Sequence, residues 1–296
     1  MKLIETTAEL LPFISGEDGI YKMIERAGRT CYKSTDKMTD DSAKPFVERM
    51  IKSGHTAMLE HGTVYLKVPV ETWRKDEHEW TYMFPEGLPW VSLDCDGKYW
   101  YITTNFRHIL EGNVGIETMN KYLCPPTEFH EKRYTFKFTT DRGISHELVR
   151  HRKFSFAQES QRYCNYSKKR HGSEITFIIP SWMPQVEKHI DTSNGFGVLV
   201  GEELYAFLGK AERHYFYLLD SGLQPQQARD VLPNATKTEI IMTGFTSDWR
   251  FLLDLRLFEK TGKVHPDMLS LMQKTQKVMQ EAGIWDDIMK YPSKFD

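Results

Sequence analysis

The sequence is poor in the features that mark several large classes of protein. Its four cysteines, Cys31, Cys95, Cys124 and Cys164, are scattered with no CxxC pair, so neither a disulfide scaffold nor a structural zinc site is expected. No apolar run reaches the length of a membrane span. The opening MKLIETTAELLPFI carries acidic residues and no small-residue cleavage site, so it does not look like a secretory signal peptide. These absences favour a soluble cytoplasmic protein with no membrane partner and no metal.

The chain also lacks a strong charge of either sign. Lysine and arginine number 39 and aspartate and glutamate 41, for a net charge of −2, whereas a protein that binds nucleic acid over its whole surface is usually more basic. Internal repeats and low-complexity tracts are absent. With 40% hydrophobic residues over 296 positions, the chain can bury a sizeable core. We expect one domain over 1–296, with an insertion at about 75–135.

Apolar periodicity indicates a mixture of helices and strands. The predicted helices cover 19–32, 42–54, 142–150, 197–222, 225–233, 248–258 and 266–282. The predicted strands cover 63–71, 99–106, 133–140, 174–180 and 238–246. Asp141 is the expected N-cap of the helix at 142–150, and the strand at 133–140 is expected to return to the sheet that 63–71 begins. Since the elements do not alternate as regular βαβ units, the α+β class fits best.

The chemistry of the chain concentrates in RHRKFSFAQESQRY, residues 150–163. From 147 to 170, seven cations and two acids give a local charge of +5, which attracts an anion. The cations are Arg150, Arg152, Lys153, Arg162, Lys168, Lys169 and Arg170, and the acids are Glu147 and Glu159. Arginine suits phosphate because its planar fork donates two parallel hydrogen bonds. Phe154 and Phe156 alternate with polar residues, so one side of the segment is expected to be buried while the other lines a cleft.

Charge alone leaves three interpretations of this segment open. It is a solvated basic loop beside a helix end, where the helix dipole favours cations; or a nucleic-acid patch, which the KKRH run at 168–171 mildly supports; or a site for a small anionic ligand.

The spacing of the segment points to a family. The order Arg150, His151, Arg152, then Ser160, Arg162 and Tyr163 closely resembles the signature of flavin-dependent thymidylate synthases. Four other segments resemble that family in the same order along the chain. They are RTCYKS near residue 30, HTAMLEH at 55–61, QQARDVLP at 226–233, and LLDLR followed by KVHPDM at 252–268.

Some positions depart from the family's pattern. A glutamate often found in the middle of the signature is Gln158 here. A glutamine that lies just before the Arg-His-Arg triplet in some members is Glu147 here. The asparagine and arginine that some members use for flavin fall on Phe245 and Ser247. The predicted insertion contains an asparagine and an arginine, Asn105 and Arg107. This pair is a candidate to replace the two missing flavin contacts.

The resemblance implies a fold and a reaction. The fold is a mostly antiparallel twisted sheet with helices packed around it. The reaction is methylation of deoxyuridine monophosphate (dUMP) at C5, with the carbon from methylenetetrahydrofolate and the hydride from reduced FAD, which NADPH regenerates. The assembly implied is a homotetramer with active sites shared between subunits.

The resemblance also implies roles for individual residues. Arg256 is the catalytic candidate, because a guanidinium against the pyrimidine stabilises the anion formed there. The expected flavin contacts are His55, Glu60, Arg150, His151, Arg152, Gln158 and His265. The expected nucleotide contacts are Glu147, Arg150, Gln158, Glu159, Ser160, Gln161, Arg162, Arg229 and Arg256. Nothing in the sequence places a base beside Ser160, so a binding role is favoured over a nucleophilic one.

Two other functions compete with this hypothesis. One is a nucleic-acid-binding module that uses the basic stretch at 150–170. The other is a metal-dependent nucleotide hydrolase built on His55, His61 and Glu60, although His-x5-His is poor spacing for one helix face. Taken alone, His61 is as readily a core histidine as a ligand, Glu60 an ion-pair partner of the basic segment, and Arg229 a helix cap.

Overall fold

A four-stranded antiparallel sheet forms the centre of the molecule. The computed structural model describes residues 1–75, 77–85, 87–168, 172–183 and 200–295, so predicted cations Lys169 and Arg170 and the predicted helix start at 197–199 lie outside the described residues. The strand order is β2-β6-β9-β7. The strands are β2 (Thr7–Leu10), β6 (Arg133–Asp141), β7 (Ser155–Gln158) and β9 (Lys237–Phe245).

The two faces of this sheet are covered by different helices because successive side chains of a strand point to opposite sides. Phe136, Phe138 and Met242 pack with Trp249 on one face, which helices α7 and α11–α13 cover. Each such large buried side chain contributes about 1.5–3 kcal/mol. Ile241 and other apolar residues of the opposite face pack against α1. The helices are α1 (Gly16–Cys31), α7 (Arg142–Leu148), α11 (Thr246–Arg256), α12 (Pro266–Glu281) and α13 (Trp285–Met289).

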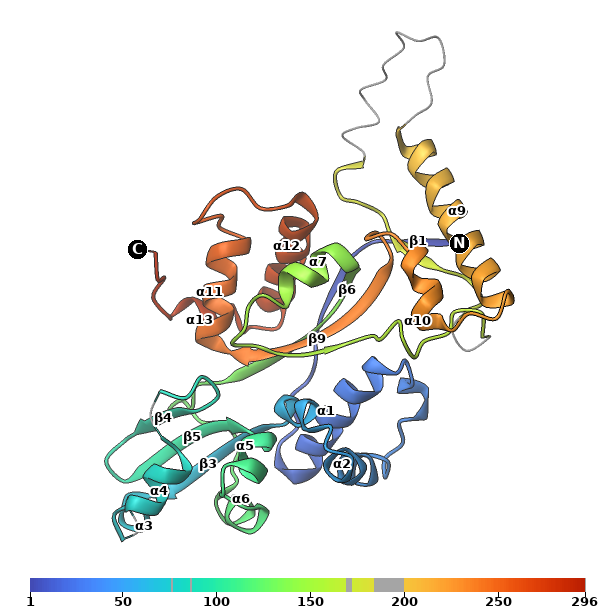
Figure 1. Cartoon of the computed structure of the whole chain (residues 1–296). Helices are drawn as coiled ribbons and strands as arrows, with labels where there is room; N and C mark the ends of the chain where they lie inside the picture. The colour runs from blue at the N-terminus through green and yellow to red at the C-terminus, as the bar shows by residue number, and fades with distance from the viewer. Residues whose placement is uncertain (76, 86, 169–171, 184–199, 296) are drawn as a thin grey trace.

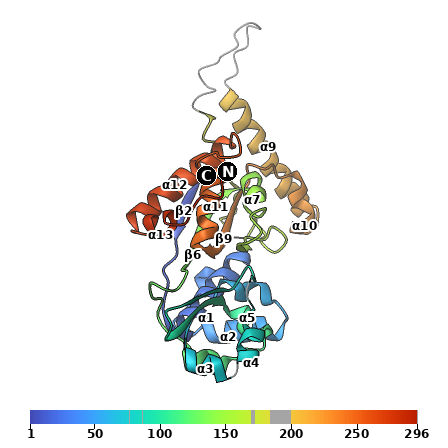
Figure 2. The same cartoon turned by 90° about the vertical axis from the view of Figure 1, so that its left-hand side faces the viewer.

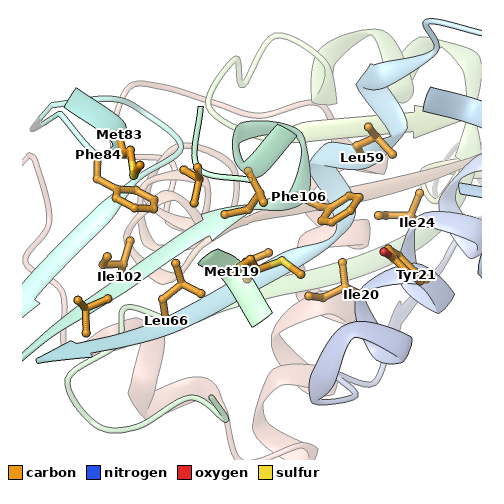
Figure 3. Packing of buried hydrophobic residues seen from close by; sticks show 14 of the residues in the cluster. Ile20, Tyr21, Ile24, Leu59, Leu66, Met83, Phe84, Ile102, Phe106 and Met119 are labelled. Carbon is orange, nitrogen blue, oxygen red and sulfur yellow. The ribbon is translucent and has the colours of Figure 1, made fainter. Parts of the chain in front are cut away.

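A second sheet, of three strands in the order β3-β5-β4, forms the lower lobe in Figure 1. Its strands are β3 (Thr63–Pro69), β4 (Ser92–Cys95) and β5 (Tyr99–Asn105), and the helices around it are α2 (Ala43–Lys52), α3 (Val70–Lys75), α4 (Glu77–Met83), α5 (Phe106–Glu111) and α6 (Ile116–Tyr122). Figure 3 shows Ile20 and Ile24 of α1 packing against Leu66, Phe106 and other side chains of this lobe. Helix α1 therefore contributes to both cores.

The upper end of the molecule is built on a short parallel pair, β1 (Lys2–Ile4) with β8 (Thr176–Ile178). Tyr215 of α9 (Val200–Asp220) and Phe177 of β8 belong to a third core cluster. Two short turns follow α9, namely α10 (Pro225–Ala228) and the 3-10 turn η4 (Arg229–Val231). Figure 2 shows α9 and α10 on the opposite side of the molecule from α12 and α13.

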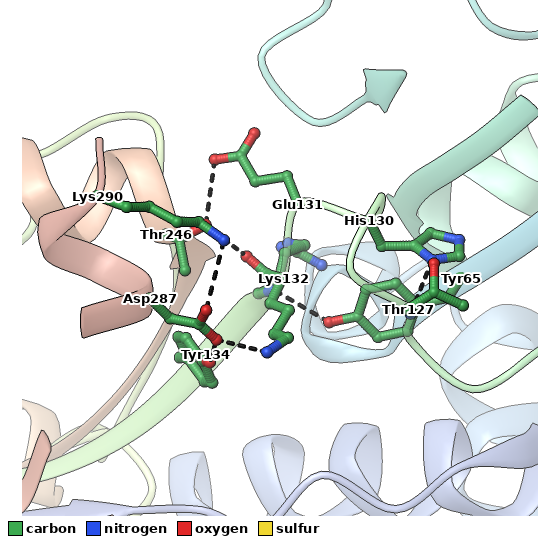
Figure 4. Close-up of polar contacts among 10 residues, drawn as sticks. Tyr65, Thr127, His130, Glu131, Lys132, Tyr134, Thr246, Asp287 and Lys290 are labelled. Atoms are coloured by element: carbon green, nitrogen blue, oxygen red, sulfur yellow. Dashed lines mark hydrogen bonds and ion pairs between the residues drawn. The ribbon is translucent and has the colours of Figure 1, made fainter. Parts of the chain in front are cut away.

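Polar contacts fix the segment that joins the two larger sheets (Figure 4). The backbone N–H of Arg133 donates to the Tyr65 hydroxyl of β3 at 3.0 Å. Tyr134 and Lys132 both donate to Asp287 of α13. The first residue of β6 is thereby tied to both lobes, so the space between the two sheets has fixed walls.

The predicted elements are largely confirmed, with ends displaced by a few residues. Asp141 is the N-cap of α7, where its Oδ1 accepts from the N–H of Ile144 at 2.8 Å. The α+β class and the mostly antiparallel pairing are also confirmed. Two features differ from the predictions. β3 and β6 lie in separate sheets, not in one, and residues 155–158 form a strand, β7, paired with β9. The further helices and strands that were not predicted are β1, β2, β4, α3, α4, α5, α6 and α13.

Candidate functional site

A cavity of about 680 Å³ lies between the two larger sheets. Glu60, Asn105 and Arg107 line it from the three-stranded lobe, and the segment Arg152–Ser155 and the end of β9 line it from the central sheet. Predicted flavin contacts from two distant parts of the chain, Glu60 and Arg152, thus meet around one space. The size is in the range of small-molecule sites, about 300–1,000 Å³.

The lining of this cavity carries an excess of positive charge. Four cations, Arg107, Arg133, Arg152 and Lys153, stand against two acids, Glu60 and Glu111, for a net +2. Arg107 donates to both acids at 2.7 Å, from Nη1 to Glu60 and from Nε to Glu111, so both acids of the lining already have a cationic partner. The predicted ion pair between Glu60 and the basic segment is instead made with Arg107.

Arg133 is the buried cation of the cavity. Its guanidinium donates to the Glu60 carbonyl oxygen at 3.2 Å, while its Nε has no hydrogen-bond partner among the described residues. Burial lowers the pKa of Arg133 to about 10, which still leaves the side chain charged at neutral pH. A buried charge with a free donor is costly unless something else compensates it, and an anionic ligand would do so.

A second cavity of about 360 Å³ adjoins the first. Arg152, Lys153 and Phe154 line both. The remaining residues of the second cavity are Arg150, His151, Asp248, Phe251, Leu255 and Arg256. Its four cations and one acid give a net +3. Two electropositive cavities that share a wall could hold two anionic ligands next to each other.

Arg256, the predicted catalytic residue, lines the second cavity and contacts two other predicted site residues. Its Nη1 donates to Glu147 at 3.0 Å and its Nε donates to Nε2 of His151 at 3.2 Å. His151 accepts at Nε2, so it carries its proton on Nδ1. Burial, and then the charge of Arg256, lowers the pKa of His151 to about 4. A neutral His151 and the side chain of Glu147 together hold the guanidinium.

Asp248 is the acid of the second cavity. Burial raises the pKa of Asp248 to about 6, although Lys153, whose Nζ is 3.6 Å from Oδ1, opposes that rise. A carboxyl group with such a pKa can carry a proton in the neutral range, which is typical of functional sites.

The second half of the signature, residues 158–163, lines neither cavity. The Gln158 amide donates to Ser145 and Thr238. Glu159 is buried, and its Oε2 is 2.8 Å from Nζ of Lys237. Their predicted roles as ligand contacts stay predictions, and Glu159 already has a structural partner.

The other predicted contacts are dispersed over the chain. Gln161 is buried, Ser160 accepts from the Arg162 backbone N–H at 3.3 Å, and Arg162 is exposed. Arg229 lies in η4, close enough to Arg142 for its charge to lower the pKa of Arg142 after the larger effect of burial. His55 and His265 are exposed at the starts of η2 (Thr56–His61) and α12. Within one chain these residues line neither cavity. Their predicted ligand contacts therefore depend on the prediction that active sites are shared between subunits.

Sequence reasoning missed Lys153, Arg133 and Asp248 as site residues. Lys153 belongs to the basic segment and directly follows Arg152, a predicted flavin contact, so its position could have indicated a place in the site. Arg133 and Asp248 were read as parts of a strand and a helix, and no local pattern separates them from structural residues. Arg107 was considered only as a substitute flavin contact, and it does line the first cavity.

His61 is a core histidine. It is fully buried, and its Nδ1 lies 2.8 Å from the Thr243 hydroxyl. Burial, and then the charge of Arg133, lowers the pKa of His61 to about 3. The described residues contain no group of three His, Cys, Asp or Glu side chains arranged to hold a metal ion.

Two depressed histidine pKa values make stability depend on pH. The pKa values of His61 and His151 in the folded protein lie below the ordinary 6.5. Their stabilising effect is therefore complete above pH 6.5 and is lost as the pH falls toward the folded values. We expect each to lower the free energy of unfolding by about 1.4 kcal/mol per pH unit in that window. Urea unfolding at pH 7, 6 and 5 measures how the free energy of unfolding changes with pH. His61→Gln should lower that slope by up to about 1.4 kcal/mol per pH unit, which corresponds to one proton.

The exposed His78 of α4 provides the matched control for that measurement. His78→Gln should leave the pH slope of the unfolding free energy unchanged. An equal slope in wild type and His61→Gln would contradict the assignment of His61 as a buried neutral side chain.

Comparisons with known proteins place the chain among its relatives. The family described as Thymidylate synthase complementing protein matches residues 125–281, more than half of the chain. A flavin-dependent thymidylate synthase of Corynebacterium aurimucosum is 25% identical over 273 residues, covering 90% of this chain and 78% of the relative. One of Pyrococcus furiosus is 27% identical over 208 residues, covering 69% and 76%. A crystal structure of the UMP/dUMP methylase PolB from Streptomyces cacaoi bound with 5-Br dUMP aligns at 17% identity and a TM-score of 0.44, covering 98% of this chain and 97% of that chain.

No described helix is both long enough and apolar enough to cross a membrane.

Proposed function

Because the chain belongs to the thymidylate synthase complementing protein family, the flavin-dependent thymidylate synthases, we propose that it methylates dUMP at C5 to give dTMP. The observation that carries this proposal is the pair of adjoining cationic cavities that share Arg152, Lys153 and Phe154. A reaction between a nucleotide and a dinucleotide cofactor needs two anion sites side by side. Family membership favours this function over the nucleic-acid module and the metal-dependent hydrolase.

The proposal also covers the cofactors, the carbon donor, the cellular location and the assembly of the protein. The flavin is FAD, NADPH reduces it, and methylenetetrahydrofolate donates the carbon. The protein acts in the cytoplasm as a homotetramer with shared active sites, over a single domain with an insertion at about 75–135. His55, His265 and Arg229 line neither cavity of their own chain and are exposed or half-exposed. This supports shared sites, because such groups are free to meet ligands of a neighbouring subunit.

The cavity between the sheets fits a flavin dinucleotide. Its aromatic side chains, among them Trp90, Phe154 and Phe245, suit a flat ring system, and its net charge of +2 suits a pyrophosphate. The unpartnered Nε of buried Arg133 is a donor of the kind that such a ligand would satisfy. Arg133, Arg152 and Lys153 would hold the cofactor, and the bound flavin would supply the hydride.

In the second cavity, the chain binds and polarises the nucleotide. Arg150 and Arg152 are exposed cations that can take its phosphate. Arg256 keeps donors beyond those given to Glu147 and His151, and a guanidinium against the pyrimidine would stabilise negative charge on the ring. That stabilisation raises the electron density at C5 without an enzyme nucleophile. Ser160, whose hydroxyl receives a backbone hydrogen bond, keeps a binding role.

Flavin binding is the direct test of this function. Purified protein incubated with FAD is expected to show flavin absorption that NADPH bleaches and dUMP perturbs. Arg152→Gln, which removes a cation common to both cavities, should weaken FAD binding about 10-fold or more, since a hydrogen bond to a charged group is worth about 1.5–3 kcal/mol. Arg49→Gln, on the exposed face of α2, is the matched control and should bind as wild type does. A protein that stays colourless after incubation with FAD would overturn the proposal.

A further inference from the structure

Two exposed aromatic side chains stand at the first cavity on a part of the chain that precedes the family match at 125–281. Trp90 is 43% exposed and Tyr82 is 66% exposed, and both line the cavity. Single exposed aromatic residues are common and need no explanation. Trp90 differs from an ordinary surface residue because hydrogen bonds through half-buried His108 hold its indole at the cavity.

A histidine fixes the indole of Trp90. The indole Nε1–H donates to Nδ1 of His108 at 3.3 Å, and Nε2 of His108 lies 2.8 Å from the carbonyl oxygen of Met83. A carbonyl only accepts, so Nε2 carries the proton and Nδ1 is free to accept from Trp90. Burial lowers the pKa of His108 although its hydrogen bond to Met83 opposes this, so the imidazole is neutral and the contact holds at neutral pH.

The imidazole of His108 is itself held in place by its surroundings. Its ring packs on buried Phe84, with ring centroids 5.5 Å apart. The Asn105 side chain caps α5 by accepting from the backbone N–H of His108 at 2.9 Å. A Cβ at position 112 would come within 2.7 Å of the imidazole, so Gly112, which also lines the cavity, leaves the space that the ring occupies. The arrangement thus fixes an indole at a polar cavity and leaves part of it exposed.

We propose that Trp90 is a ligand-binding residue whose indole stacks on a flat heteroaromatic ring of the cavity's anionic ligand, and that His108 is its positioning residue. This inference rests on the proposed function, which supplies ligands of that chemistry: the isoalloxazine and adenine rings of FAD and the pterin of the folate. Stacking on an exposed indole combines with the cations of the cavity walls, so that ring and phosphate are recognised together.

The test compares ligand affinities of Trp90 variants for FAD, FMN and tetrahydrofolate. Trp90→Ala is expected to weaken binding about 10-fold, in line with about 1–3 kcal/mol for one stacked base, whereas Trp90→Phe keeps most of the affinity. Trp90 is exposed, so neither variant should change the melting temperature. Tyr217→Ala, at an exposed residue of α9, is the matched control and should bind as wild type.

Two further measurements test the contact of Trp90 with the ligand and the positioning role of His108. Quenching of tryptophan fluorescence by bound ligand should be smaller in Trp90→Phe than in wild type. His108→Ala and Gly112→Ala should reduce the affinity less than Trp90→Ala does. In either background, removing Trp90 should cause a smaller further loss than it causes in wild type.

Each outcome has a defined meaning. Loss of FAD affinity with unchanged FMN affinity assigns the indole to adenine, loss of both to the isoalloxazine, and loss of folate affinity alone to the pterin; all three support the proposal. Wild-type affinity of Trp90→Ala for all three ligands overturns this proposal and leaves the proposed function intact. Failure of wild-type protein to bind any of the three overturns the proposed function, and this inference with it.

Discussion

Replacement of Arg256 by alanine is expected to lower the rate of dTMP formation at saturating dUMP by about 10²–10³-fold, the usual cost of removing one donor that stabilises developing negative charge. Arg256 lines the second cavity and is held by Glu147 and His151. The ion pair with Glu147 joins side chains that are 24% and 30% exposed, and pairs with that much exposure contribute about 0–1 kcal/mol to stability. The fold should therefore survive the substitution. Steady-state kinetics together with a thermal unfolding curve measure both effects.

Three further variants test whether the reaction needs the guanidinium group of Arg256 or only a positive charge at that position. Arg256→Lys keeps the charge but loses the planar fork, so it should recover only a small part of the rate. Glu147→Gln leaves the guanidinium in place with a weaker partner and should cost less than Arg256→Ala. Arg49→Ala removes an exposed arginine from α2 and should have no effect. Wild-type turnover by Arg256→Ala would show that this guanidinium does not act on the pyrimidine.

Local sequence patterns predicted most elements of the fold but not which strands pair. The strands at 63–71 and 133–140 alternate in the same way, and that period indicates only a half-buried strand. In the structure, β3 pairs with β5 and β6 pairs with β9, pairings set by contacts between residues far apart in sequence. The four residues of β7 were missed because polar side chains hide a strand whose Phe156 and Ala157 pack on the two faces.

The candidate site was predictable where the family resemblance marked it and unpredictable where only tertiary contact creates it. Arg256, His151 and Glu147, all marked as site residues by the resemblance, lie in contact in the structure. The contact between Glu60 and Arg107 spans 47 positions, and Arg133 reaches the cavity only because β6 begins at the junction of the two lobes. Neither arrangement leaves a periodic or spacing signal. Within the predicted insertion, β5 is the central strand of its sheet and α5 provides a wall of the cavity.

Replacement of Lys237 by methionine is expected to destabilise the protein by about 3–5 kcal/mol, because it removes the cation shared by buried Glu159 and half-buried Glu239. Among the described cations, Glu159 then keeps only the more distant Lys33, at 3.8 Å. The Nζ of Lys237 is 2.8 Å from Glu159 and 2.9 Å from Glu239. Glu159 is 1% exposed, and its other oxygen accepts from the Tyr166 hydroxyl at 3.1 Å. Burial opposes the charge of Lys237, but the two carboxylates outweigh it and raise the pKa of Lys237. Its stabilising effect is therefore complete at neutral pH. Urea unfolding at pH 7 measures the loss.

The double variant Glu159→Gln/Lys237→Met decides what Glu159 does. If Glu159 is the structural partner of Lys237, the double variant removes both charges, leaves Glu239 its contact with Lys137 at 3.2 Å, and should be more stable than the sum of the single effects predicts by about 0.5–3 kcal/mol. If Glu159 instead contacts the nucleotide, Glu159→Gln should raise the KM for dUMP while Lys237→Met does not. Strictly additive stabilities with an unchanged KM would contradict both roles. The burial of Glu159 and its short contact with Lys237 favour the structural one, because a carboxylate already neutralised inside the protein has little charge left to offer a ligand.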